Sequence, residues 1–348
     1  MPTPSLGRWH VPAEWERHSR CWMAWPRGGG SWPGGLEAAA SALTELARTI
    51  AAFEPVTMIC NPEDAVDASL ACGPGIQVLP LEIGDGWLRD TGPSFLVNDS
   101  GGVAGIHWRL DDRSGRIADP DADATIGRRI LEHLSLPTYE APLALEGGAF
   151  SVDGAGAVLV TEQCLLQRGC NAGLSRPEIE DHLKACTGAV TVIWLGGGCR
   201  DDATGGHVDE VACFVAPGVV LALTTDDPLD SNFAMLQDNL DRLTKARDAR
   251  GRSLEVVTVH QPTRRPHGAG SERLAMSYTN LYLANGVVIL PGFGDAADQE
   301  ARRTLRKLFP HREMVQLPAL EIAAASSSLH DLTLHQPAAL PLPYDPVI

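Results

Sequence analysis

The sequence has no hydrophobic run long enough to cross a membrane and no excess of basic residues. No apolar stretch reaches the roughly 18 residues that a spanning helix needs, so no membrane partner is expected. Lys and Arg total 28 against 44 Asp and Glu, a formal net charge of -16. This balance argues against a nucleic-acid partner, because such proteins usually present a basic surface. Met1 to Ser5 show no basic start before an apolar core, so no secretory signal and a cytoplasmic location are expected.

Paired cysteines are also missing. The chain has 8 cysteines, and none of them forms a Cys-x-x-Cys motif. Their scattered positions argue against a structural zinc site and indicate free thiols in a reducing compartment. The composition, 44% hydrophobic and 21% charged, is typical of a soluble globular protein.

Short apolar strands alternate with helices along the chain, which predicts an α/β protein. Strands are expected at 56–60, 76–81, 157–161, 190–195, 219–224, 254–259, 280–284, 287–290 and 314–317, and helices at 36–53, 176–186, 232–250 and 296–309. A hairpin around Asn285-Gly286 and the short strands argue against one parallel doubly wound sheet. Repeated small units around a centre fit better. No linker divides the chain, so one domain over residues 1–348 is expected.

Four polar clusters interrupt this apolar pattern. They are Trp87 to Pro93, Glu146 with the following two glycines, His207-Val208-Asp209, and His330-Asp331. The first three lie beside glycine or proline, as side chains at strand ends facing a pocket often do. One such cluster alone would more often be a turn cap, an ion pair or a core histidine. Four together predict a functional site.

Taken in order, these segments resemble the agmatine deiminases of the Porphyromonas-type peptidylarginine deiminase family. The similarity runs nearly end to end, from Pro12 to Glu16 and Trp22 to Pro26, through Thr161 to Leu166, to Asn280 to Gly286 and Phe293 to Asp295. The resemblance implies the pentein fold, an α/β propeller of five pseudo-symmetric ββαβ-like units around a central funnel. It also implies a homo-oligomer and a small cationic guanidino or amidino ligand.

The resemblance further implies a role for each residue of the site. Asp90 and Asp209 would clamp the edges of a planar guanidinium, whose N–H groups suit carboxylates. His207 would be the general acid and base, oriented by Glu146. Further substrate-binding candidates are Trp25, Trp87 and Arg89.

The match to the family fails at the nucleophile. In the family a cysteine follows the C-terminal histidine and attacks the guanidinium carbon, whereas here Asp331 follows His330. Leu329-His330, Thr333 and Gln336-Pro337 fix the register. Glycines before this segment are replaced by Ala325, Ser326 and Ser327, which is expected to remove backbone freedom. A carboxylate is a far weaker nucleophile than a thiolate, so the substrate class is better defined than the reaction.

Three interpretations of Asp331 are therefore open. It is a general base or a nucleophile in an enzyme that cleaves a C–N bond of a guanidino or amidino compound. Alternatively, the carboxylate-rich pocket binds a cation without chemistry, because crowded carboxylates favour a cation between them. In the third interpretation the same groups hold a divalent metal that activates water. The spacing does not demonstrate a metal, and no other cofactor is expected. Cys170 and Cys199 are alternative nucleophiles, but neither falls at the family position.

Overall fold

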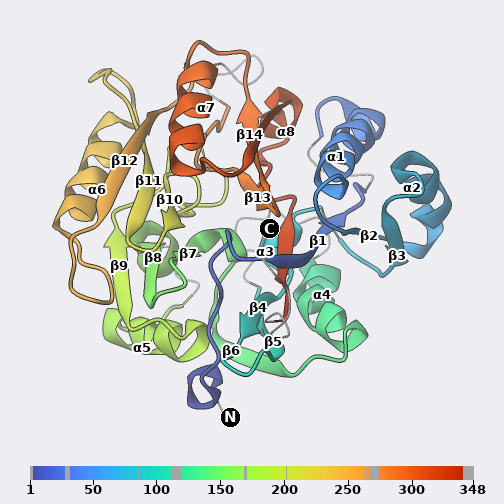
Figure 1. Ribbon diagram of the computed structural model, residues 1–348, viewed down its shortest axis with the longest axis horizontal. Helices are drawn as coiled ribbons and strands as arrows, with labels where there is room; N and C mark the ends of the chain where they lie inside the picture. The colour runs from blue at the N-terminus through green and yellow to red at the C-terminus, as the bar shows by residue number, and fades with distance from the viewer. Residues whose placement is uncertain are drawn as a thin grey trace.

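Five small β-sheets are arranged around the centre of the molecule in the computed structural model (Figure 1). The structure describes residues 3–27, 32–84, 86–110, 120–167, 171–200, 202–263, 265 and 274–339. The longer helices lie on the outside of the ring of sheets (Figure 1). This is the five-unit pentein arrangement that the family resemblance implied.

Four of the units repeat one topology. The first two strands are antiparallel, a helix follows, and the third strand runs parallel to the second. The helix is needed because parallel neighbours require a crossover connection. The units are β4 (Ser94–Val97), β5 (Val103–Arg109), α4 (Pro120–His133) and β6 (Thr138–Ala144); β7 (Phe150–Val152), β8 (Ala157–Thr161), α5 (Arg176–Thr187) and β9 (Thr191–Leu195); β10 (Ala212–Ala216), β11 (Val219–Thr224), α6 (Phe233–Lys245) and β12 (Glu255–His260); and β13 (Tyr282–Ala284), β14 (Val287–Gly292), α7 (Ala297–Leu308) and β15 (Glu313–Pro318).

The remaining unit joins the two ends of the chain. Its first strand is β16 (Leu334–Pro337), which pairs antiparallel with β1 (His18–Ala24). The chain continues through α1 (Gly35–Ala51), β2 (Val56–Cys60), α2 (Ala65–Cys72) and β3 (Gln77–Pro80), and these strands are parallel. Short helical segments are η1 (Pro4–Gly7), η2 (Pro62–Asp64), α3 (Leu88–Thr91), η3 (Gly147–Ala149), η4 (Gln163–Gln167) and α8 (Leu320–Ala324). Closing the ring through β16 carries Asp331 to the centre.

Most predicted elements are confirmed within a few residues. β2, β8 and β11 have the predicted bounds. The hairpin is confirmed by the pairing of Ala284 with Val287 and by a φ of 79° at Gly286. The predicted extent of α6 was wrong, because the helix ends at Lys245. Asp248 explains the end: its Oδ1 accepts hydrogen bonds from the backbone N–H groups of Arg250 and Arg252, which fold the chain into a turn.

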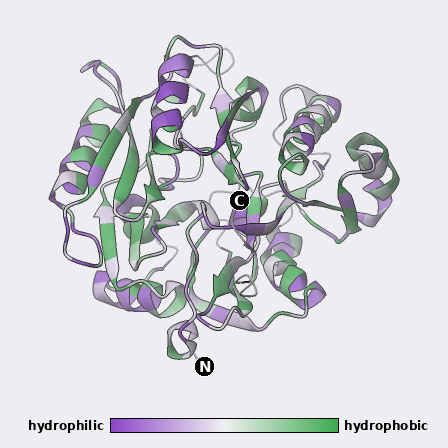
Figure 2. Ribbon diagram, viewed as in Figure 1, coloured by the Kyte–Doolittle hydropathy of each residue, from purple (hydrophilic) through white to green (hydrophobic). Residues whose placement is uncertain are grey.

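The apolar core lies between sheets and helices, not at the centre of the ring. Its largest cluster spans the units from β7 to β15 and includes Phe214, Leu236 and Leu305. The strands are mostly hydrophobic while α7 is mostly hydrophilic (Figure 2). Within the described ranges, no helix is both long and apolar enough to span a membrane. The centre is thus left to polar side chains.

Candidate active site

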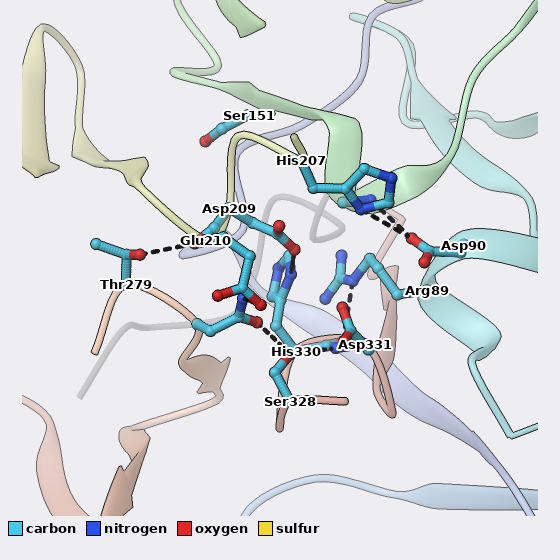
Figure 3. Close-up of polar contacts among 12 residues, drawn as sticks. Arg89, Asp90, Ser151, His207, Asp209, Glu210, Thr279, Ser328, His330 and Asp331 are labelled. Carbon is cyan, nitrogen blue, oxygen red and sulfur yellow. Dashed lines mark hydrogen bonds and ion pairs between the residues drawn. The ribbon is translucent and has the colours of Figure 1, made fainter. Parts of the chain in front are cut away.

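The four predicted clusters meet at the centre, and the repeat explains why. Each cluster lies in the segment just before the first strand of a unit: Asp90 before β4, Glu146 before β7, Asp209 before β10 and Asp331 before β16. In the fifth unit Asn280 takes the same place before β13. Because the units are arranged around one centre, these equivalent segments converge although they are far apart in sequence (Figure 3).

His207 is fully buried between two carboxylates. Its Nε2 is hydrogen bonded to Oε2 of Glu146, and its Nδ1 lies 3.8 Å from Oδ1 of Asp90. Nδ1 has no hydrogen-bond partner among the described residues. Burial lowers the pKa of His207, but Asp90 and Glu146 outweigh burial and raise the pKa to about 10. The ring is therefore an imidazolium at neutral pH, with a proton to give.

Gly147 and Gly148 let these segments approach each other. A Cβ on Gly148 would lie 2.7 Å from both Nδ1 of His207 and Oδ2 of Asp209. A Cβ on Gly147 would lie 2.2 Å from the backbone O of Arg89. The N–H of Gly148 donates to Oδ1 of Asp90 at 3.1 Å. Only glycine leaves room for this contact, which accounts for the pair after Glu146.

A second buried histidine, His330, holds Asp209. Its Nδ1 is 2.7 Å from Oδ2 of Asp209, and its Nε2 is 2.9 and 3.0 Å from the two carboxylate oxygens of Glu14. Burial and the Arg89 charge lower the pKa of His330. Glu14 and Asp209 raise it by more, so that the net pKa is about 9. Oδ1 of Asp209 is buried and has no hydrogen-bond partner in the part of the chain that the structure describes.

Asp331 is 2% exposed and lies in the turn before β16. Its N–H donates to Oγ of Ser328 at 3.2 Å, and its carbonyl O accepts from the backbone N–H of Arg89 at 3.0 Å. Ser326 has a φ of 55°. The serine that replaces a family glycine therefore still adopts the left-handed backbone, and the expected loss of backbone freedom does not prevent this conformation.

Glu210 was not predicted, although it directly follows Asp209. It is buried, and its Oε1 accepts from Nδ2 of Asn280 at 2.8 Å. Burial raises the pKa of Glu210 well above its ordinary value, and the nearby Asp202, Asp209 and Asp331 carboxylates raise it further. The only hint in the sequence was its place beside the predicted clamp.

The other predicted site residues make different contacts. Trp87 is buried in the core next to α1 and β2, and Trp25 packs against the same cluster. The Arg89 guanidinium contacts Glu14 at 3.1 Å and Nδ1 of His335 at 3.2 Å. The substrate-binding roles of these residues stay predictions. Cys199 is buried in the core cluster, and Cys170 lies outside the described residues.

Asp90, Glu146 and His207 offer three ligand atoms within 4.8 Å of one another, which a divalent metal could use. A metal ligand must be a neutral imidazole. A metal would therefore have to displace the His207 proton and the bond between His207 and Glu146. With a His207 pKa of about 10, this geometry suits an imidazolium between two carboxylates better than a metal.

The chain is similar to known proteins over nearly its whole length. The family model of the Porphyromonas-type peptidyl-arginine deiminases matches residues 10–337. A relative from Legionella pneumophila is 41% identical over 96% of each chain. The agmatine deiminase of Stutzerimonas stutzeri is 38% identical over 97% of each chain. The structure of the agmatine deiminase of Enterococcus faecalis superposes with a TM-score of 0.92 at 32% identity, covering 98% of this chain and 99% of that one.

Proposed function

We propose, since this chain belongs to the Porphyromonas-type peptidyl-arginine deiminase family, that it hydrolyses a C–N bond of a small guanidino or amidino cation without a thiol. The observation that carries the proposal is the convergence of Asp90, His207 and Asp209, buried together around one centre. Two carboxylates can grip the N–H groups of a planar cation from its edges. The family relationship supports the substrate class, and the reaction is inferred from the residues.

In this proposal Asp331 takes the role that the cysteine has in the family. It accepts a proton from a water that attacks the central carbon, or it attacks that carbon itself. His207, already an imidazolium, donates its proton to the leaving nitrogen, which departs as ammonia. Water supplies the oxygen of the new carbonyl group. It adds to the carbon directly in the first route, and in the second it breaks the bond between that carbon and Asp331, which restores the carboxylate. A carboxylate is a weak nucleophile, which favours an amidino compound or another substrate more electrophilic than agmatine.

A non-catalytic binder is the second candidate function. The observation that favours it is the number of carboxyl groups at one centre: Asp90, Asp209, Glu210 and Asp331 are all buried. Burial raises the pKa of Glu210 most, and the charges of Asp202, Asp209 and Asp331 raise it further. A cation held there relieves the repulsion among these charges whether or not a bond is broken.

The deciding experiment is incubation of the purified protein with agmatine, arginine and a panel of guanidino and amidino compounds, with and without divalent metals, followed by mass spectrometry. Replacement of =NH by =O adds about one mass unit, and Asp331→Asn is expected to abolish that product. The control Cys199→Ala should keep it, because Cys199 lies in the core. Turnover by Asp331→Asn would overturn the mechanism. Thermal stabilisation by one compound without product would select the binder, and turnover only with added metal would select metal catalysis.

The proposal includes three further predictions. The chain acts as a single pentein domain and works in the cytoplasm, and it assembles as a homo-oligomer, as the family resemblance implies. The five closed units support the first of these. Size-exclusion chromatography with light scattering tests the last, and a monomeric mass would contradict it.

A further inference from the structure

Asp209 is one end of a chain of charged groups that includes Glu14 of the N-terminal arm, the segment 3–17 before β1. The chain runs from Arg89 to Glu14 at 3.1 Å, from Glu14 to Nε2 of His330 at 2.9 Å, and from Nδ1 of His330 to Asp209 at 2.7 Å. Figure 1 shows the arm crossing the molecule toward its centre. The arm lies outside the sheets, yet it contributes a side chain that contacts the site.

Both ring nitrogens of His330 are engaged, so the ring is fixed in one orientation. Nδ1 bonds one oxygen of Asp209, and Nε2 is shared by both oxygens of Glu14. A ring held at both ends leaves the Asp209 carboxylate little freedom to rotate. Its second oxygen, Oδ1, is then held in place with no hydrogen-bond partner among the residues described. A buried carboxylate oxygen without a donor is costly unless a ligand supplies one.

Arg89 connects this chain to the rest of the site through both its backbone and its side chain. Its N–H donates to the carbonyl O of Asp331 at 3.0 Å, and its Nε to the carbonyl O of His330 at 3.4 Å. Arg89 directly precedes the second clamp, Asp90, in α3. Arg89, a residue of α3, therefore contacts both the turn that carries Asp331 and Glu14 of the arm.

We propose that His330 and Glu14 are positioning residues: His330, held by Glu14, fixes the Asp209 carboxylate so that Oδ1 is presented to the N–H groups of the ligand. The inference rests on the proposed function, since it assigns to Asp209 the role of clamp. Neither residue touches the ligand. They act through Asp209, and the arm thereby becomes part of the binding apparatus.

The charges that face His330 give the proposal a pH signature. Glu14 and Asp209 support the imidazolium, while Arg89 opposes it. His335 lies beyond Arg89, and its own pKa is held well below the ordinary value by burial and by the His18 and Arg89 charges, so it is neutral. As pH rises through about 9, His330 loses its proton and the orienting bond weakens. Ligand affinity is expected to fall over that range.

The test is calorimetric titration of the full chain with agmatine from neutral pH to above pH 9. Glu14→Gln is expected to weaken affinity roughly tenfold, the lower end of the cost of a lost hydrogen bond to a charged group. It should also move the alkaline fall in affinity to lower pH, because a carboxylate that supports the imidazolium is gone. In His330→Gln that fall should be absent. A loss of stability alone would shift neither pH profile.

The matched control is Glu16→Gln, which removes a carboxylate from the same arm. Oε1 of Glu16 accepts from the backbone N–H of Ala13 at 3.1 Å, so this variant disturbs the arm but not His330. Asp209→Asn separates the two hypotheses. If it leaves affinity unchanged, the proposed function is wrong. If it weakens affinity while Glu14→Gln and His330→Gln both bind like the wild type, only the positioning role is overturned.

Discussion

Two buried imidazoles, His207 and His330, lie in the candidate site and are surrounded by the same kinds of group. Each lies between two carboxylates, and in each the carboxylates raise the pKa, to about 10 and about 9. They differ in what their second nitrogen does. Nδ1 of His207 has no hydrogen bond to any described residue, whereas both nitrogens of His330 are taken. Two histidines with the same kinds of neighbour can therefore have different roles. A ring nitrogen without a hydrogen bond suits a proton donor, whereas a ring with both nitrogens bonded suits an orienting group.

The carboxylate partners of the two histidines also differ. His207 is bonded to Glu146, whose side chain is 12% exposed. His330 is bonded to Glu14, whose side chain is 25% exposed and which Arg89 holds from the other side. Solvent exposure therefore does not separate the two pairs, whereas the Arg89 contact fixes only the second.

The largest expected effect comes from removing the ring with the available nitrogen. His207→Gln should lower turnover of any guanidino or amidino substrate by about 10²–10⁴-fold, the usual contribution of a general acid or base. Ammonia release at saturating substrate measures it. The matched control is His260→Gln: this imidazole also lies between two carboxylates, Asp226 at 3.0 Å and Glu300 at 2.9 Å, but on the surface. Equal losses in the two variants would contradict a catalytic role for His207.

A smaller effect is expected at Gly148, which lies against both His207 and Asp209. Gly148→Ala would place a Cβ 2.7 Å from His207 and from Asp209, so it should disturb both histidine pairs at once. Overpacking of this kind costs about 1–3 kcal/mol of unfolding free energy. Urea unfolding measures the stability, and calorimetry measures agmatine affinity.

The control for this variant is Gly75→Ala. A Cβ there meets nothing within 4 Å, so stability and affinity should stay near the wild-type values. If Gly148→Ala behaved in the same way, the close approach of Gly148 to His207 and Asp209 would not matter for binding.

The sequence predicted the type of fold and the middle of the site better than its support. Short strands and the Asn285-Gly286 hairpin are local signals, and they indicated small repeated units. α4 was missed although Pro120 and the following acidic residues are typical of a helix start. That Asp90, His207 and Asp209 would converge came from the family resemblance, because no local pattern brings distant segments together.

Glu14 shows why the rest could not be predicted. It lies 316 residues from His330 in the sequence, and nothing near it in the chain indicates a buried partner. The use of Arg89 to hold Glu14 and His335, in addition to its predicted contact with substrate, likewise depends on packing between segments. Roles of this kind follow from three-dimensional neighbours and not from residue type.

The smallest expected effect concerns Glu210. Burial raises its pKa, the Asp209 charge raises it further, and the His207 charge lowers it. Because its pKa is raised in the folded state, the native protein binds a proton that the unfolded chain releases above its ordinary pKa of about 4.3. Its contribution to stability is thus present at acid pH and is lost as pH rises. Glu210→Gln should be more stable than the wild type at pH 8, because its unfolding releases no proton from this position. The amide oxygen can still accept from Asn280. Thermal unfolding at pH 4.5 and pH 8 measures the difference in stability between the variant and the wild type. A gain in stability of equal size at both pH values would show that Glu210 does not hold an extra proton in the folded protein.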